Sequence, residues 1–222
     1  MNNSVSNTAR LLGAGLRALL VLTLVTGVLY PLVVTGIAQG LFNSNANGSE
    51  VKADGRVVGS SLIGQAYNLP LKKGQETPAP DLKWFQGRPQ NGLGTNSVNT
   101  QYKLILSGAT NRSGDNEELI QWVKDAKAAV VKDNSTGTYQ VKPSQVPADA
   151  VTSSGSGLDP NISPQYADIQ VHRVAEKHGL STAEVQKLVD EHTEGRALGF
   201  MGEPRVNVLE LNIALKELAA KS

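Results

Sequence analysis

The densest group of residues able to do chemistry lies at residues 151–160, which read Val-Thr-Ser-Ser-Gly-Ser-Gly-Leu-Asp-Pro. Two glycines between hydroxyl residues give a flexible backbone whose amides are able to bind an anion or a phosphate group. Ser156 is also a potential nucleophile, but it lacks the Gly-x-Ser-x-Gly frame and has no base at a recognisable spacing. A third interpretation is a loop that leads into a helix at Ser163, and the spacing favours this loop.

A second dense segment, residues 199–207, reads Gly-Phe-Met-Gly-Glu-Pro-Arg-Val-Asn. Its glycines and its proline indicate a shaped turn. Glu203 and Arg205 carry opposite charges, so they either pair locally or face a partner. The simpler interpretation is a structural turn that leads into the last helix.

Several kinds of chemistry are missing from the sequence. The absence of cysteine excludes disulfides, thiolate zinc sites and cysteine nucleophiles. There is no Gly-Lys dipeptide for a Walker loop and no Asp-Lys-Thr-Gly for a phosphorylated aspartate. His172, His178 and His192 lack metal-site spacing. The net charge of +1 gives no reason to expect nucleic acid as a partner. We therefore expect no catalytic residue and no metal site.

An uncharged stretch near the start of the chain predicts a membrane segment. Residues 18–49 contain no charged side chain, and residues 19–37 consist mainly of Leu, Val and Ile. As a helix, that stretch would be about 29 Å long, close to the hydrocarbon thickness of a bilayer. We therefore expect residues 18–42 to cross a membrane as a helix. A cleaved signal peptide ending near Gly40 is the alternative, although its apolar region is ordinarily shorter.

The flanking charges predict an orientation. Arg10 and Arg17 precede the apolar stretch with no acid before it, and the first charge after it is Glu50. By the positive-inside rule, residues 1–17 stay in the cytoplasm and residues 43–222 form a single extracytoplasmic domain. The expected location is the cell (inner) membrane, with a single crossing.

Within the membrane segment, small residues offer positions where another helix can approach closely, among them Gly27 and Gly36. Pro31 is expected to weaken or kink the helix at residues 28–30. A passive anchor that faces lipid explains the same residues.

The remainder of the chain predicts an α+β fold with a small hairpin region and a helical C-terminal third. Asp54-Gly55 predicts the turn of a hairpin over residues 51–58, with residues 60–63 extending its second strand. Residues 43–49 and 68–118 appear irregular, with residues 84–85 and 102–106 as the anchors of the longer segment to the core. A strand is expected over residues 138–141.

Four helices are expected in this part, and their caps are visible in the sequence. The first covers residues 116–131 with Asp115 as N-cap, and the second runs from Ser163 to a stop at Gly179. A third follows a Ser181-Thr-Ala-Glu capping box, and the last begins at Asn207.

Taken together in this order, four stretches closely resemble the C subunit of the Kdp potassium-transporting P-type ATPase of bacteria and archaea. The stretches are residues 59–65 (Gly-Ser-Ser-Leu-Ile-Gly-Gln), 84–89 (Trp-Phe-Gln-Gly-Arg-Pro), 146–164 and 198–212. With the membrane helix in the expected place, the resemblance covers essentially the full length. The chain departs from the family where Asn161 replaces a common His, and where residues 107–111 replace a Ser-Gly-Gly-Ser-Asn stretch.

The resemblance implies a non-catalytic accessory subunit of a pump that imports potassium at the expense of ATP. Its implied partners are the ATPase subunit, the channel-like potassium-binding subunit, any small membrane subunit, and lipid. The family's C subunit acts as a catalytic chaperone that raises the ATPase subunit's affinity for ATP. By analogy with the signature loop of another transporter ATPase class, Ser154, Gly155, Ser156 and Gly157 would contact nucleotide.

The predicted topology conflicts with that analogy, because it places these four residues outside the cytoplasm and away from ATP. The effect on ATP affinity would then travel through the membrane helix and the assembly. We expect no tightly bound cofactor, with ATP acting through the ATPase subunit. The residues that we nominate for partner contact are Gly27, Pro31, Gly36, Gln65, Arg88, Asp159, Glu203 and Arg205. Two alternatives are a membrane-anchored extracytoplasmic binding module and a membrane-anchored serine hydrolase that uses Ser156.

Overall fold

The computed structural model describes residues 2–75, 77–90, 94–95 and 105–221, and it divides the chain into two compact units, residues 1–50 and 51–222. The first unit is helical. Helix α1 (Asn2–Leu24) continues through a π-helical turn (Val25–Leu29) into α2 (Tyr30–Leu41), and a single turn, α3 (Asn43–Ala46), follows. The prediction that residues 43–49 lack helical character was therefore wrong in part. The side-chain amide of Asn47 donates to the backbone oxygen of Asn43 and stabilises this turn.

The π-helical turn is the structural effect of Pro31. Proline has no N–H, and its ring crowds the carbonyl oxygen four residues earlier, that of Gly27. The helix widens just before the proline, so the N–H of Tyr30 bonds to the oxygen of Val25, five residues back. The predicted weakening near residues 28–30 is confirmed, and it takes the form of a wider turn within a continuous helix.

A hairpin begins at the last residue of the first unit. Strands β1 (Glu50–Ala53) and β2 (Arg56–Ser60) pair around Asp54 and Gly55, whose φ angles are 50° and 74°. Two positive φ angles in a two-residue turn match the right-handed twist of the strands, as predicted. Strand β2 ends at Ser60, because the Ser60 hydroxyl and carbonyl accept the N–H groups of Leu62 and Ile63. The expected extension of β2 through residue 63 was wrong.

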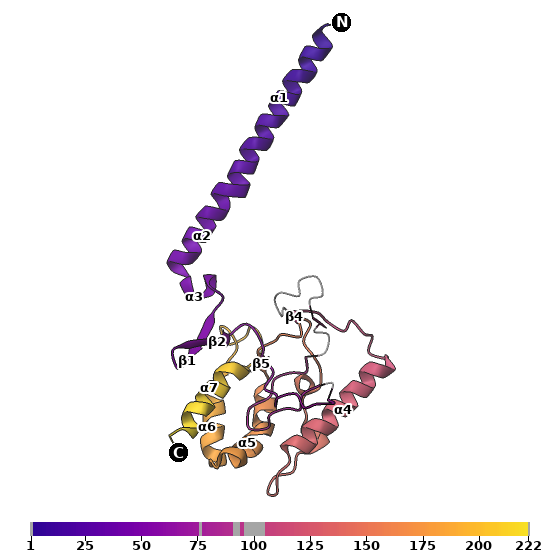
Figure 1. Cartoon of the computed structure of the whole chain (residues 1–222), viewed down its shortest axis with the longest axis vertical. Coiled ribbons are helices and arrows are strands. Elements are labelled where there is room, and N and C mark those ends of the chain that lie inside the picture. Colours follow the sequence, from indigo (N-terminus) through magenta and orange to yellow (C-terminus); the bar gives the residue numbers. More distant parts are fainter. Residues whose placement is uncertain (1, 76, 91–93, 96–104, 222) are drawn as a thin grey trace. The chain divides into compact units, whose positions relative to one another are not determined.

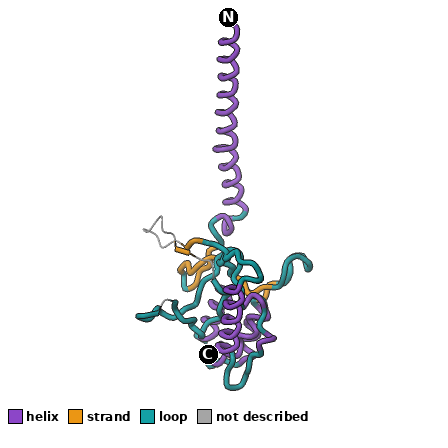
Figure 2. The backbone as a smooth tube through the Cα atoms, turned by 90° about the vertical axis from the view of Figure 1, so that its right-hand side faces the viewer, coloured by secondary structure: helices purple, strands orange, loops and turns teal. Residues whose placement is uncertain are grey.

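Loops and turns make up much of the second unit, and its strands are short (Figure 2). Strands β3 (Gly94–Thr95) and β4 (Ile105–Leu106) pair antiparallel. A three-stranded sheet has the order β5-β7-β6, all antiparallel, with bounds Asn161–Ile162, Arg205–Asn207 and Thr193–Glu194. The helices are α4 (Glu117–Asn134), α5 (Pro164–His178), α6 (Thr182–Glu191) and α7 (Val208–Ala219), and short 3₁₀ turns lie at Pro143–Gln145 and Ala148–Ala150.

The predicted caps of the last three helices are confirmed. The Ser163 hydroxyl accepts from the N–H of Tyr166, and Gly179 ends α5 at φ 68°. Ser181 and Glu184 form a reciprocal capping box on α6, and Asn207 caps α7. The N-cap of α4 is Asn116 and not Asp115, because the Asn116 side chain accepts from the N–H of Leu119.

In the irregular part of the chain, one further prediction failed and a second is wrong at Leu106. Residues 138–141 form no strand, because the hydroxyls of Ser135 and Thr136 accept the N–H groups of Val141 and Tyr139 and close a turn instead. Leu106 does not anchor its loop to the core, since 48% of it is exposed. Residues 102–104 of that predicted anchor lie outside the described residues.

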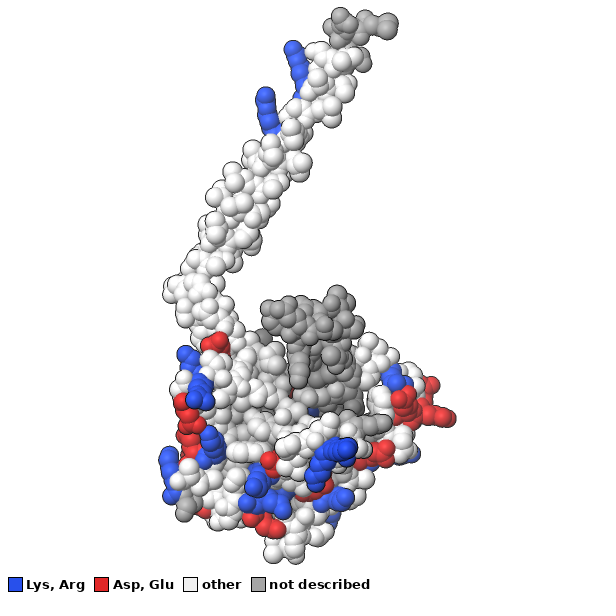
Figure 3. All heavy atoms as spheres, in the orientation of Figure 1, with Lys and Arg blue, Asp and Glu red and all other residues white. Residues whose placement is uncertain are grey.

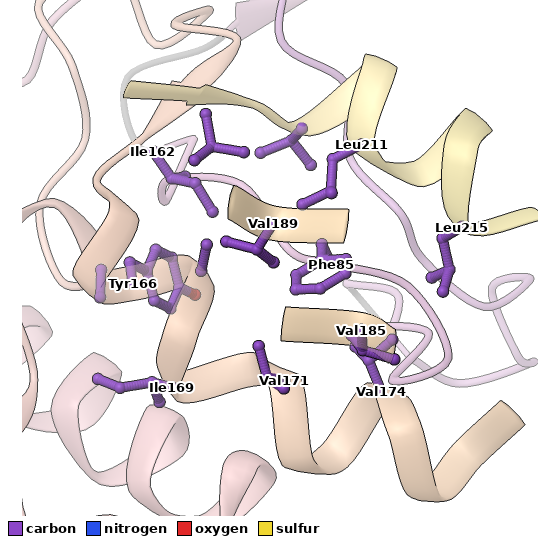
Figure 4. Close-up of a cluster of buried hydrophobic side chains, with 14 of the residues drawn as sticks. Phe85, Ile162, Tyr166, Ile169, Val171, Val174, Val185, Val189, Leu211 and Leu215 are labelled. Carbon is purple, nitrogen blue, oxygen red and sulfur yellow. The ribbon is translucent and has the colours of Figure 1, made fainter. Parts of the chain in front are cut away.

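The core of the second unit forms around Phe85, which is fully buried. Figure 4 shows aliphatic side chains from α5, α6 and α7 converging on its ring, including Val174, Val185 and Leu211. Burial of a Phe side chain contributes about 1.5–3 kcal/mol relative to leaving it exposed. The predicted anchor at residues 84–85 is therefore confirmed.

Buried amide side chains hold the backbone of this anchor from two helices. The Asn212 side chain accepts from the N–H of Phe85 and donates to its oxygen, both at 2.9 Å. The Gln170 side chain likewise accepts from the N–H of Gln86 at 2.7 Å and donates to its oxygen at 3.1 Å. Each pair replaces the two hydrogen bonds that a neighbouring strand would supply, so an irregular segment is fixed without joining a sheet.

Candidate functional site

The four stretches that carry the family resemblance meet in the fold. The Gly64 N–H donates to the oxygen of Leu158 at 2.8 Å and joins the first stretch to the third. The Asn207 side chain donates to the oxygen of Ser61 at 2.8 Å and joins the fourth to the first. Phe85 and Asn212 join the second to the fourth through their paired hydrogen bonds. Segments far apart in sequence thus form one junction, and the residues below surround it.

Arg88 fixes the Ser/Gly loop, which we define as residues 152–160. Its Nη1 lies 3.0 Å from Oδ2 of Asp159, and its Nε and Nη2 donate to the oxygens of Thr152 and Ser153 at 3.4 and 3.3 Å. The two charged side chains are 23% and 29% exposed, so water screens this ion pair only in part. Arg88 lies on the segment that Asn212 and Gln170 hold, and the loop is therefore tied to the core.

The Ser/Gly loop uses its polar groups internally. The hydroxyl of Ser156 accepts from the N–H of Leu158 at 3.0 Å, and that of Ser154 accepts from the N–H of Asp159 at 3.4 Å. The N–H of Gly157 donates to the Ser154 oxygen, and Gly157 has φ 68°. Three consecutive amides thus already have acceptors, so an incoming phosphate would have to replace these bonds.

Ser156 has no base within this arrangement. Its hydroxyl lies 3.3 Å from the Ser154 hydroxyl, and its carbonyl accepts from Ser107. In the part of the chain that the structure describes, no histidine or carboxylate is hydrogen-bonded to the Ser156 hydroxyl. A serine nucleophile needs such a base, so the geometry supports the loop interpretation.

A hollow of about 530 Å³ gathers four of the nominated partner-contact residues. Arg88, Asp159, Glu203 and Arg205 all line it. Asp149 lies in the same wall, where its carboxylate accepts from the N–H and the hydroxyl of Ser163 at 2.7 and 2.9 Å. The hollow therefore combines paired charges of both signs with a carboxylate that two hydrogen bonds hold in place.

Glu203 and Arg205 each form a local ion pair, which was one of the two predicted alternatives. They do not pair with each other. Glu203 bonds to Arg196 at 2.7 Å, and Arg205 bonds to Glu194 at 2.8 Å. Glu203 and Arg205, two positions apart, thus bond to different partners, which the sequence spacing did not reveal.

The other four candidates lie elsewhere. Gln65 donates to the oxygen of Val58 at 2.9 Å and lines a separate hollow of about 340 Å³. Gly27, Pro31 and Gly36 belong to the helix of the first unit. A Cβ at Gly27 would meet only a Thr23 methyl at 3.9 Å, and one at Gly36 would meet nothing within 4 Å. Their contact with a partner stays a prediction.

The three histidines make separate contacts. His172 stacks on Tyr139 with ring centroids 3.9 Å apart, His178 lies 2.9 Å from the oxygen of Lys83, and His192 lies 2.9 Å from the oxygen of Leu188. No group of three metal-ligating side chains occurs within the described residues.

Sequence reasoning missed a buried charge beneath the site. Arg173 is 2% exposed and donates to the Asn134 and Gln170 side chains and to the oxygens of Leu82 and Trp84. Burial lowers its pKa to about 10, and burial likewise raises the pKa of Tyr166 to about 12. Neutral oxygens surround the guanidinium, so its role is to hold the segment before Arg88. Spacing on α5 gives little signal of this role, because only Gln170 is a near neighbour and the other acceptors lie 39 to 91 residues away.

Comparison with known proteins identifies relatives over the whole chain. Residues 12–217 match the family model described as KdpC, "K+-transporting ATPase, c chain". Two relatives, each named potassium-transporting ATPase KdpC subunit, come from Streptomyces avermitilis (83% identity, all of both chains) and Streptomyces coelicolor (76% identity, 99% of this chain and 98% of the relative). A third of the same name, from Kineococcus radiotolerans, is 42% identical over 99% of this chain and all of its own.

Proposed function

This chain belongs to the KdpC family, the c chain of the K+-transporting ATPase, and from that premise we propose that it holds the pump together as a non-catalytic subunit and biases its conformation. In this proposal the chain crosses the cell membrane once and carries its α+β domain on the extracytoplasmic side. Its partners are the ATPase subunit, the channel-like potassium-binding subunit and any small membrane subunit.

The observation that best supports the proposal is the length and the apolar, exposed surface of the N-terminal helix. It runs unbroken over Val5–Leu41 and is long and apolar enough to cross a membrane. No part of its most apolar 18 residues is buried. Thirty-seven helical residues span about 55 Å, well beyond the hydrocarbon thickness. So large an apolar surface needs lipid or other membrane helices to cover it.

Charge supports the proposed orientation. Arg10 and Arg17 lie on the N-terminal part of the helix, and Glu50 is the first charge beyond it. Residues 18–49 carry no charge, whereas on the face seen in Figure 3 charges of both signs are interspersed over the second unit. A surface of this second kind suits water and not lipid.

We further propose that the chain raises the ATP affinity of the ATPase subunit without binding ATP itself. An extracytoplasmic Ser/Gly loop is separated from cytoplasmic ATP, and its amides from Gly157 to Asp159 already have acceptors within the loop. A subunit that binds one conformation of the pump more tightly than another shifts the ATP affinity at a distance. The membrane helix, with Gly27, Pro31 and Gly36, is the route that we propose for this coupling.

Two measurements test the proposal. A periplasm-active reporter fused after Ser222 is expected to be active, and a cytosol-active one silent. Replacement of residues 18–42 by an unrelated apolar helix is expected to abolish co-purification of the other pump chains in mild detergent. Activity of the cytosolic reporter would overturn the orientation. Normal assembly of the helix-swapped chain would reduce the helix to a passive anchor and favour a tethered binding module.

A further inference from the structure

Three large apolar side chains project from the loop between β6 and β7. Leu198, Phe200 and Met201 are 83%, 72% and 53% exposed. We call these three residues the apolar tip. Single exposed apolar residues are ordinary on protein surfaces, but here three lie within four positions of one loop.

The loop that carries the apolar tip is ordered. Ala197 and Met201 exchange two backbone hydrogen bonds at 2.9 Å, and the N–H of Gly199 donates to the oxygen of Arg196 at 3.0 Å. Leu198 has φ 54°, a left-handed conformation that a leucine adopts only at a cost of about 1–3 kcal/mol. Strain at so exposed a position supports a functional hypothesis for this loop. A pre-ordered loop also loses little entropy when it binds.

The base of the loop carries no net charge. Two ion pairs, Arg196 with Glu203 and Arg205 with Glu194, balance each other across the stem. Segments that insert into lipid headgroups ordinarily combine apolar residues with an excess of Lys and Arg. An apolar centre of Phe, Met and Leu surrounded by paired charges is typical of a protein interface, where the rim stays polar and the centre loses its water.

We infer that the apolar tip docks in an apolar recess on another chain of the same ATPase, with an uncharged or charge-balanced rim. The hollow lined by Arg88, Asp159, Glu203 and Arg205 adjoins the stem of this loop and extends the same surface. The inference rests on the proposed function in one respect, that the chain works inside the assembled pump.

Cross-linking in the assembled pump tests the inference directly. p-Benzoylphenylalanine in place of Phe200, in the full chain co-expressed with the other pump chains, is expected to cross-link to one of them under light. The matched control carries the same amino acid in place of Leu71, which is 58% exposed in a different loop, and is expected to give no such product. A product with lipid, a product with a second copy of this chain, or no product from an intact pump would each overturn the inference.

Substitution measures how much the apolar tip contributes to the affinity for the other pump chains. Phe200→Ser with Met201→Ser is expected to weaken capture of the other pump chains about tenfold or more, as loss of an interface centre does. The melting temperature of the variant chain should be unchanged, because both side chains are exposed. Leu71→Ser is the control and should capture normally. Equal capture by the double variant and the wild type would remove the apolar tip from the interface. If the wild-type chain itself captures nothing, the proposed function fails instead.

Discussion

Two glycine-rich loops of the second unit differ in what they do with their side chains. The Ser/Gly loop has the residues that suggest chemistry, yet its hydroxyls bond to its own amides and Arg88 ties it to the core. The loop of the apolar tip has no reactive group, yet it exposes Leu198 and Phe200 to solvent. Residue types able to do chemistry are here part of the architecture, and the residues left over for a partner are apolar.

The largest effect is expected where the Ser/Gly loop touches the first resemblance stretch. A Cβ at Gly64 would lie 2.5 Å from the carbonyl oxygen of Asp159. Backbone cannot yield as a flexible side chain would, so Gly64→Ala should lower the free energy of unfolding by about 3 kcal/mol. The measurement is chemical denaturation of the full chain in detergent. Gly155→Ala is the matched control, since nothing lies within 4 Å of a Cβ there. Equal stability of the two variants would mean that the loop is not held as described.

The second largest loss of stability is expected when the contacts of Arg88 with the Ser/Gly loop are removed. Arg88→Ala deletes the ion pair with Asp159 and two hydrogen bonds to loop carbonyls, and it leaves a half-buried carboxylate without its cation. We expect a loss of about 2 kcal/mol in the free energy of unfolding. Arg205→Ala, which breaks an ion pair that is 58% exposed on both sides, should cost less than about 0.5 kcal/mol. A similar loss from both variants would contradict the difference between the partly buried Arg88–Asp159 pair and the exposed Arg205–Glu194 pair.

Local signals in the sequence predicted the fold well, and long-range ones were invisible. The Asp54-Gly55 turn and the caps at Ser163, Ser181 and Asn207 are confirmed, because each depends on residues at most four apart. The sheet of β5, β7 and β6 was missed, since strands of two or three residues show no alternation.

The same distinction holds at the candidate site. Arg88 and Asp159 were both nominated, yet their pairing across 71 residues was not foreseen. The buried amides of Gln170 and Asn212 bond to partners 84 and 127 residues away, so no spacing rule reveals them. The apolar tip was seen only as a turn, because exposure is a property of the tertiary structure.

A third prediction concerns the two serines of the Ser/Gly loop and ATP. Ser154→Ala with Ser156→Ala removes two loop hydrogen bonds and should cost about 1 kcal/mol in the free energy of unfolding. If the loop is architectural, the KM for ATP of the assembled pump should change by less than about twofold. Exchange of residues 18–42 for an unrelated helix, in any fraction that still assembles, should raise that KM. A large rise in KM from the serine variant alone would restore the loop as a nucleotide contact.

The smallest expected effect is a gain in the free energy of unfolding. It tests most directly whether the side chains of the two loops support their own loop or are free to contact a partner. Leu198→Gly relieves the left-handed strain but gives the unfolded chain more freedom, so the free energy of unfolding should rise by about 0.5 kcal/mol. Ala197→Gly, where φ is not positive, relieves nothing and should lower stability slightly. A stabilised Leu198→Gly chain that captures its partner chains less well would show stability given up for contact. Loss of stability would instead mean that the Leu198 side chain supports its own loop, as the hydroxyls of Ser154 and Ser156 do in theirs.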